Sequence, residues 1–147
     1  MATQSVYRYT LKREKTGLIR EDFQLSAPDR VVEYIRATGI ASEEQEHLIT
    51  LVMDPKNQIR GYYTVVIGLA DQAVAHAREI FRYAIMMNAS AIVIAHNHPS
   101  GNTEPSNDDV RLTADMRDAA KIIDIRLLDH IIVSETSYFS FREKNMI

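Results

Sequence analysis

The feature that most constrains the fold is a continuously apolar run at residues 91–95, which reads Ala-Ile-Val-Ile-Ala. A strand with one face in water alternates apolar with polar side chains, whereas a strand that is covered on both faces is apolar throughout. Such a strand needs a packing layer on each side. The run therefore predicts an α/β fold in which helices cover a sheet around a buried central strand.

Alternating apolar residues, turn residues and capping residues predict the elements around this run. We expect strands at residues 5–12, 46–53, 58–67, 125–133 and 137–142, and helices at residues 26–38, 73–87 and 107–120. Ser26 and Ser106 are the expected N-caps, and Asn88 is expected to end the second helix in a left-handed conformation. The expected apolar helix faces are Val31, Val32 and Ile35, then Ile80, Ala84 and Met87, then Leu112, Met116, Ala119 and Ile123. Together these elements predict a layered α-β-α sandwich with a mixed sheet.

Length and composition fit one soluble domain. The chain has 147 residues and a hydrophobic fraction of 46%, which is enough to bury a core without covalent crosslinks. It has no cysteine, which excludes disulfides, cysteine-ligated metals and thiol nucleophiles. No apolar run approaches the length of a membrane span, and the N-terminus lacks a basic region followed by an apolar one. We therefore expect a cytoplasmic protein that does not interact with membranes.

Charge is distributed unevenly along the chain. The formal net charge is −3, which counts against a protein whose main task is to bind phosphate backbones. Residues 1–20 nevertheless carry five Lys or Arg against one Glu, a local charge of +4 that leaves −7 for the remainder. We expect a basic arm at residues 1–25 and one domain at residues 26–147. The arm could contact nucleic acid or an acidic partner, but a solvated edge strand protected by its charges is favoured.

The segment that carries chemistry follows the apolar run directly, at residues 96–109. His96 and His98 are two residues apart at the end of a strand, so their side chains point to the same side. The loop contains Pro99, Gly101 and Pro105 and turns the chain back, which brings Asp109 into the first turn of the next helix. Two imidazoles and one carboxylate can converge on one ion and leave a fourth position for water, as in a catalytic zinc site.

A structural role for the same residues stays open. A His-x-His pair at a strand end is often incidental polar surface. Asp109 lies three residues after Ser106, which is the spacing of a capping box, in which the acid accepts a hydrogen bond from the N–H of the cap residue. A carboxylate that binds a metal cannot fully serve that N–H, so the two roles of Asp109 are expected to compete.

The spacing His-x-His-Pro, six residues, Ser, two residues, Asp resembles the signature of the JAMM (MPN+) metalloproteases. Residues 78–81, 88–89, 124–126 and 129–133 also resemble the bacterial RadC-like branch, and the likeness runs from about residue 43 to residue 141. Full-length RadC proteins resemble one another in an N-terminal helical region that resembles DNA-binding domains. This chain is too short to hold such a region, so it resembles a short, single-domain member.

The resemblance implies a JAMM fold with an architecture like that of cytidine deaminases, one zinc ion per chain, and cleavage of peptide or isopeptide bonds. The implied zinc ligands are His96, His98 and Asp109. Glu46 falls at the position of the family's general base, and Ser106 at that of the residue whose hydroxyl donates to the developing oxyanion. A charged strand edge is the alternative role for Glu46. Asp129 and His130 would either orient a ligand or satisfy their own backbone.

Other functions stay open. The RadC resemblance also implies DNA repair or mobile-element association, as a DNA-associated factor or a metal-dependent nuclease. A two-metal nuclease would need a second cluster of carboxylates. A nucleoside deaminase needs a Pro-Cys-x-x-Cys segment, and the chain has no cysteine. A catalytically inactive scaffold disagrees with the complete ligand set. The sequence makes no prediction of the oligomeric state.

Overall fold

The computed structural model describes residues 1–17, 28–68 and 75–147. Its elements in chain order are α1 (Pro28–Ala37), the 3-10 helix η1 (Ile40–Ser42), β1 (His47–Met53), β2 (Ile59–Ile67), α2 (Ala77–Met86), β3 (Ala91–Asn97), α3 (Asn107–Ile123), β4 (Arg126–Val133) and β5 (Tyr138–Ser140). The helices and strands predicted after residue 26 are all present, with shifted ends. The expected N-cap of the first helix, Ser26, lies outside the described residues.

β3 is the central strand of a five-stranded sheet with the order β2-β1-β3-β4-β5. It pairs in parallel with β4, whereas the other neighbouring strands are antiparallel, so the sheet is mixed as predicted. All seven residues of β3 are buried, which confirms the inference from the apolar run. The strand continues two residues beyond that run, so His96 and Asn97 still belong to it.

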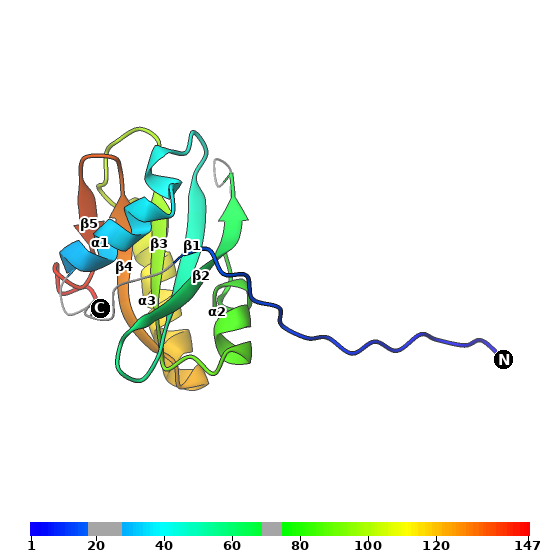
Figure 1. The fold of residues 1–147 in the computed structure, drawn as a ribbon. Coiled ribbons are helices and arrows are strands. Elements are labelled where there is room, and N and C mark those ends of the chain that lie inside the picture. Colours follow the sequence, from blue (N-terminus) through cyan, green and yellow to red (C-terminus); the bar gives the residue numbers. More distant parts are fainter. Residues whose placement is uncertain (18–27, 69–74) are drawn as a thin grey trace.

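Helices cover both faces of the sheet, which confirms the predicted α-β-α sandwich (Figure 1). α1 packs on one face through the three residues predicted to form its apolar side. α2 and α3 pack on the other face. One prediction for α2 is wrong: Met87 is exposed, and Phe81 is buried together with Ile80 and Ala84. Met87 follows the last helical residue as the C-cap, so it does not extend the buried face.

Turn and cap residues act as their chemistry predicts. Asp54 accepts hydrogen bonds from two backbone N–H groups in the turn between β1 and β2. Asn88 has a φ of 53° and follows the end of α2 in the left-handed region. Ser106 caps α3 by accepting a hydrogen bond from the N–H of Asp109 at 3.1 Å. Asp54 and Asn88 lie near the start of β3, whereas Ser106 lies in the segment that follows its end.

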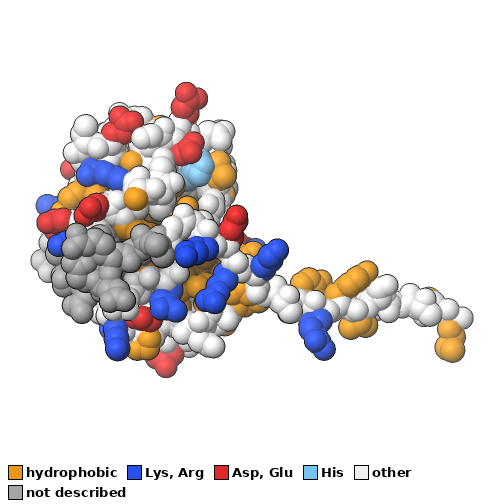
Figure 2. All heavy atoms as spheres, in the orientation of Figure 1, with side chains coloured by type: hydrophobic (Ala, Val, Ile, Leu, Met, Phe, Trp, Pro, Cys, Tyr) orange, Lys and Arg blue, Asp and Glu red, His pale blue; other side chains and the backbone are white. Residues whose placement is uncertain are grey.

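The N-terminal arm differs from the prediction, because residues 5–12 form no strand. All of residues 1–17 are exposed, and the segment extends away from the sheet (Figure 1). An extended segment without a neighbouring strand has no partners for its backbone hydrogen bonds, so alternation of residue types alone does not make a strand. Lys and Arg side chains gather where the arm leaves the domain (Figure 2). The expected boundary between arm and domain lies outside the described residues.

Among the described residues, no helix combines the length and the apolar character that crossing a membrane requires.

Candidate metal centre

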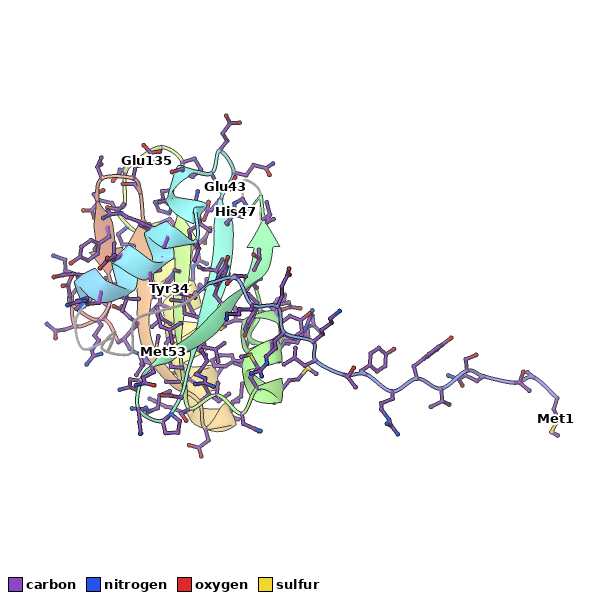
Figure 3. All side chains as sticks on the ribbon, viewed as in Figure 1. Met1, Tyr34, Glu43, His47, Met53 and Glu135 are labelled. Atoms are coloured by element: carbon purple, nitrogen blue, oxygen red, sulfur yellow. The ribbon has the colours of Figure 1, made fainter. Side chains whose placement is uncertain are left out.

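The antiparallel pairing of β1 with β3 places the start of β1 beside the end of β3. Leu48 pairs with His96, the second-last residue of β3. Figure 3 shows Glu43 and His47 at this end of β1 and Met53 at the opposite end. The segment that precedes β1 and the segment that follows β3 therefore meet at one edge of the sheet, which is where α/β folds commonly place functional sites.

Four side chains meet at this edge: Glu46 precedes β1, His96 lies at the end of β3, His98 follows that strand, and Asp109 lies in α3. The Nε2 atom of His96 lies 3.1 Å from Nε2 of His98 and 3.2 Å from Oδ1 of Asp109. The Nε2 atom of His98 lies 3.5 Å from Oδ2 of Asp109. Oε1 of Glu46 is farther away, at 3.7 Å from Nε2 of His96. One potential ligand atom from each residue lies within 4.8 Å of the other three.

These separations fit the donor set of a metal ion. Two ligand atoms bound tetrahedrally at about 2.05 Å from a zinc ion lie about 3.3 Å from each other. The three contacts among His96, His98 and Asp109 span 3.1 to 3.5 Å, which is close to that separation. The Glu46 side chain is 25% exposed and lies at the rim of the cluster. The cluster could hold a metal ion, with Glu46 beside the tighter group of three.

The electrostatics of the cluster favour a positive charge. Burial acts to raise the pKa of the Asp109 carboxyl, but its hydrogen bonds with His96 and His98 outweigh that effect and hold the pKa well below its ordinary range. The same contact with Asp109 raises the pKa of His98. A carboxylate that stays ionised beside two imidazoles stabilises any cation placed between them.

The carboxylate of Asp109 serves both the helix cap and the cluster. Oδ2 accepts a hydrogen bond from the N–H of Ser106 at 2.8 Å, while the hydroxyl oxygen of Ser106 accepts one from the N–H of Asp109. Oδ1 faces Nε2 of His96. Oδ2 also lies 3.5 Å from Nε2 of His98, so the cap and the cluster share this oxygen, whereas Oδ1 faces the cluster without a role in the cap.

The outer nitrogen of each clustered histidine is hydrogen-bonded. Nδ1 of His98 donates to the backbone carbonyl of Asn102 at 2.8 Å. A carbonyl can only accept, so Nδ1 carries the proton and the neutral ring presents a lone pair at Nε2. Nδ1 of His96 lies 2.8 Å from Nε2 of His130. That ring is fully buried and stacks on Phe141 at 4.7 Å, and burial lowers the pKa of His130 well below its ordinary value.

Asp129 and His130 divide the two roles that the sequence left open for the pair. Asp129 accepts hydrogen bonds from the N–H groups of His130 and Arg142 and from the hydroxyl of Ser140, so it fixes the backbone around β4 and β5. Burial raises the pKa of this carboxyl. The His130 ring instead reaches His96. One residue is structural, and the other contacts a candidate ligand.

Sequence reasoning missed Asn97, the residue between the two histidines. Its side chain is fully buried, and its Oδ1 accepts a hydrogen bond from the N–H of His47 at 2.6 Å. Its Nδ2 donates to the carbonyls of Glu43 and Gln45 at 3.2 and 3.1 Å. Asn97 thus holds the segment that carries Glu46 against the strand that carries His96. The available signal was strand alternation, which turns the side chain between the two histidines to the opposite face of the sheet.

We expect Asn97→Ala to lower the free energy of unfolding by about 2 to 4 kcal/mol, because it removes three hydrogen bonds made by a fully buried side chain. Urea denaturation in the presence of a chelator measures this change without any contribution from a bound metal. Asn107→Ala, at an exposed position, is the control and should change stability by less than about 0.5 kcal/mol. Equal stability of the two variants would contradict the structural role of Asn97.

Comparison with known proteins agrees with this geometry. The RadC-like JAB domain family matches residues 25–146. A UPF0758 protein of Chlorobium luteolum is 45% identical over 117 residues, which cover 80% of this chain and 52% of that protein. A UPF0758 protein of Enterococcus faecalis is 44% identical over 102 residues, which cover 69% of this chain and 44% of that protein. A third UPF0758 protein, of Clostridium kluyveri, is 33% identical over 136 residues, which cover 92% of this chain and 59% of that protein.

The chain spans about half the length of the curated relatives that it matches. The family match covers all four residues of the candidate metal cluster, the loop between His98 and α3, and the sheet that positions them. The resemblance inferred from residues 96–109 is therefore confirmed, and the chain belongs to the RadC-like JAB domain family.

Proposed function

We propose that this domain is a zinc-dependent hydrolase that cleaves peptide or isopeptide bonds. The observation that carries the proposal is the convergence of two imidazole Nε2 atoms and one carboxylate oxygen at ligand-to-ligand separations, with a second carboxylate beside them. Two histidines and one acid are a donor set that suits zinc and leaves one coordination position open. The peptide or isopeptide substrate is proposed from the JAMM likeness of the motif.

In this proposal His96, His98 and Asp109 hold the ion. Zinc, when bound, supplies a Lewis acid that lowers the pKa of a coordinated water toward neutrality. Glu46 takes the proton of the attacking water, and later delivers it to the leaving amine. Its carboxylate lies at the rim of the cluster, 3.7 Å from Nε2 of His96, and is half-buried, so it has access to both the ion and the substrate side.

Ser106 would stabilise the negative charge that develops on the substrate carbonyl oxygen. Its hydroxyl oxygen already accepts a hydrogen bond from the N–H of Asp109. Accepting uses a lone pair and leaves the O–H free to donate. The residue is exposed at the N-terminus of α3, where a substrate carbonyl can approach and where the helix dipole also favours negative charge.

We expect Ser106→Ala to lower the rate of hydrolysis about 100-fold or more, the cost of losing one oxyanion donor. The same variant should lower the free energy of unfolding by about 1 kcal/mol, because it removes the cap of α3. Ser106→Gly separates the two effects, since glycine costs the cap only a few tenths of a kcal/mol yet also lacks the hydroxyl. Equal rates for the glycine variant and the native protein would contradict the oxyanion role.

The proposed activity is tested with linear and isopeptide-branched peptides, incubated with the protein in added zinc, in chelator, and after zinc is restored. We expect turnover that disappears with the chelator and returns with zinc. DNA binding is measured in parallel across a salt series, because binding through phosphate contacts weakens steeply with salt. Tight, strongly salt-dependent DNA binding without peptide turnover would overturn the proposal in favour of a DNA-associated role.

A further inference from the structure

A buried line of hydrogen bonds connects two of the proposed ligands, His96 and Asp109, outside the cluster. Nδ1 of His96 lies 2.8 Å from Nε2 of His130, and Nδ1 of His130 lies 2.6 Å from the hydroxyl of Thr113. That hydroxyl lies 2.7 Å from the backbone carbonyl of Asp109. The side chains of His96, His130 and Thr113 are buried, with at most 1% of each residue exposed. The line thus runs from β3 through β4 to α3.

The donor and the acceptor of each hydrogen bond in this line follow from the last acceptor, the carbonyl of Asp109. The carbonyl of Asp109 can only accept, so Thr113 donates its single proton there, a bond that helical threonines commonly make to the carbonyl four residues earlier. The hydroxyl oxygen must then accept from Nδ1 of His130. A neutral ring with its proton at Nδ1 accepts at Nε2, so His96 donates from its Nδ1.

We propose that His130 and Thr113 are positioning residues that hold His96 in the tautomer with its lone pair at Nε2, aimed at the metal cluster. This inference rests on the proposed function only in requiring that the cluster binds zinc. The relay, meaning His130 and Thr113 together, also joins His96 to the backbone of Asp109. Because the two ligands come from different elements, the relay sets the position of one relative to the other.

The relay predicts an effect on zinc affinity that a purely structural role would not produce. Thr113→Val replaces the hydroxyl by a methyl group of similar shape and leaves Nδ1 of His130 without an acceptor. We expect this variant to bind zinc about 10- to 100-fold more weakly, the usual cost of losing an outer partner of a ligating histidine. Zinc affinity is measured by competition with a chromophoric chelator, so the readout does not depend on catalysis.

Two further variants define the origin of the effect. Thr113→Ser keeps the hydroxyl and should restore native zinc affinity. Thr50→Val is the matched control, because Thr50 is another fully buried threonine, located in β1, and its hydroxyl donates to the carbonyl of Ile80 outside the relay. It should lose stability in chelator, as Thr113→Val does, but keep its zinc affinity.

The tautomers provide a second and independent readout. Long-range ¹H–¹⁵N spectra of the imidazoles in the zinc-loaded protein should show His96 and His130 protonated at Nδ1. A proton on Nε2 of His130, or equal zinc affinity of Thr113→Val and Thr50→Val, would overturn the relay. Failure of the native protein to bind zinc would instead overturn the proposed function, so the two failures are distinguishable.

Discussion

We expect the native protein to retain stoichiometric zinc through purification and an Asp109→Ala variant to lose it. Asp109 provides the anionic group that lies within 3.5 Å of both histidines, and its pKa is held low by those contacts. Without it, two imidazole lone pairs remain with no charge between them to attract a cation. We expect zinc affinity to fall by more than the roughly 10- to 100-fold that loss of an outer partner costs. Elemental analysis of the purified protein measures the change directly.

Asp108→Ala is the matched control for this experiment. Asp108 is the adjacent acid in the first turn of α3, but it is exposed and pairs with Arg111. Both variants remove one negative charge from the N-terminus of α3, and only one of them removes a group from the cluster. His96→Ala should behave like Asp109→Ala. If both of those variants retain a full complement of zinc, the cluster at the end of β3 is not the metal site.

Local chemistry predicted most of the fold, because the elements of this chain carry their own signals. The apolar run identified β3, Asn88 marked the end of α2, and Ser106 marked the start of α3. The N-terminal arm was predicted wrongly at residues 5–12, since whether an extended segment becomes a strand depends on a neighbour that the segment itself does not encode. The face of α2 was misjudged at its end, where helical geometry stops.

The site divides in the same way between local and distant determinants. His96, His98 and Asp109 lie in one strand, the loop that follows it and the first turn of the next helix. Their convergence was therefore predictable from the sequence. The contacts of Asn97 and Thr113 were not predictable. The partners of Asn97 lie 50 or more residues away, and the His130 partner of Thr113 lies 17 residues further on, in another element. Such partners are set by sheet order and register, which no single segment specifies.

Glu46→Gln should separate metal binding from chemistry. Gln has nearly the same size as Glu, so the rim of the cluster keeps its shape, while the group that takes the proton is lost. The backbone of Glu46 stays in place, because its carbonyl accepts a hydrogen bond from the N–H of Gly68 at 2.8 Å and its neighbours are held by Asn97. We expect a full complement of zinc and a rate of peptide hydrolysis lowered about 100- to 10,000-fold, the usual contribution of general acid–base catalysis.

Glu44→Gln is the matched control, since Glu44 is an exposed acid in the same segment, and it should retain both zinc and activity. The two measurements on Glu46→Gln give three distinct results. Zinc retained with hydrolysis lost supports proton transfer by Glu46. Zinc lost together with hydrolysis makes Glu46 a ligand. Its Oε1 atom, which lies 3.7 Å from Nε2 of His96, would then move closer to the other ligands when the ion binds. Zinc and hydrolysis both retained would assign the proton transfer to another group, because a neutral amide cannot accept the proton of the attacking water at neutral pH.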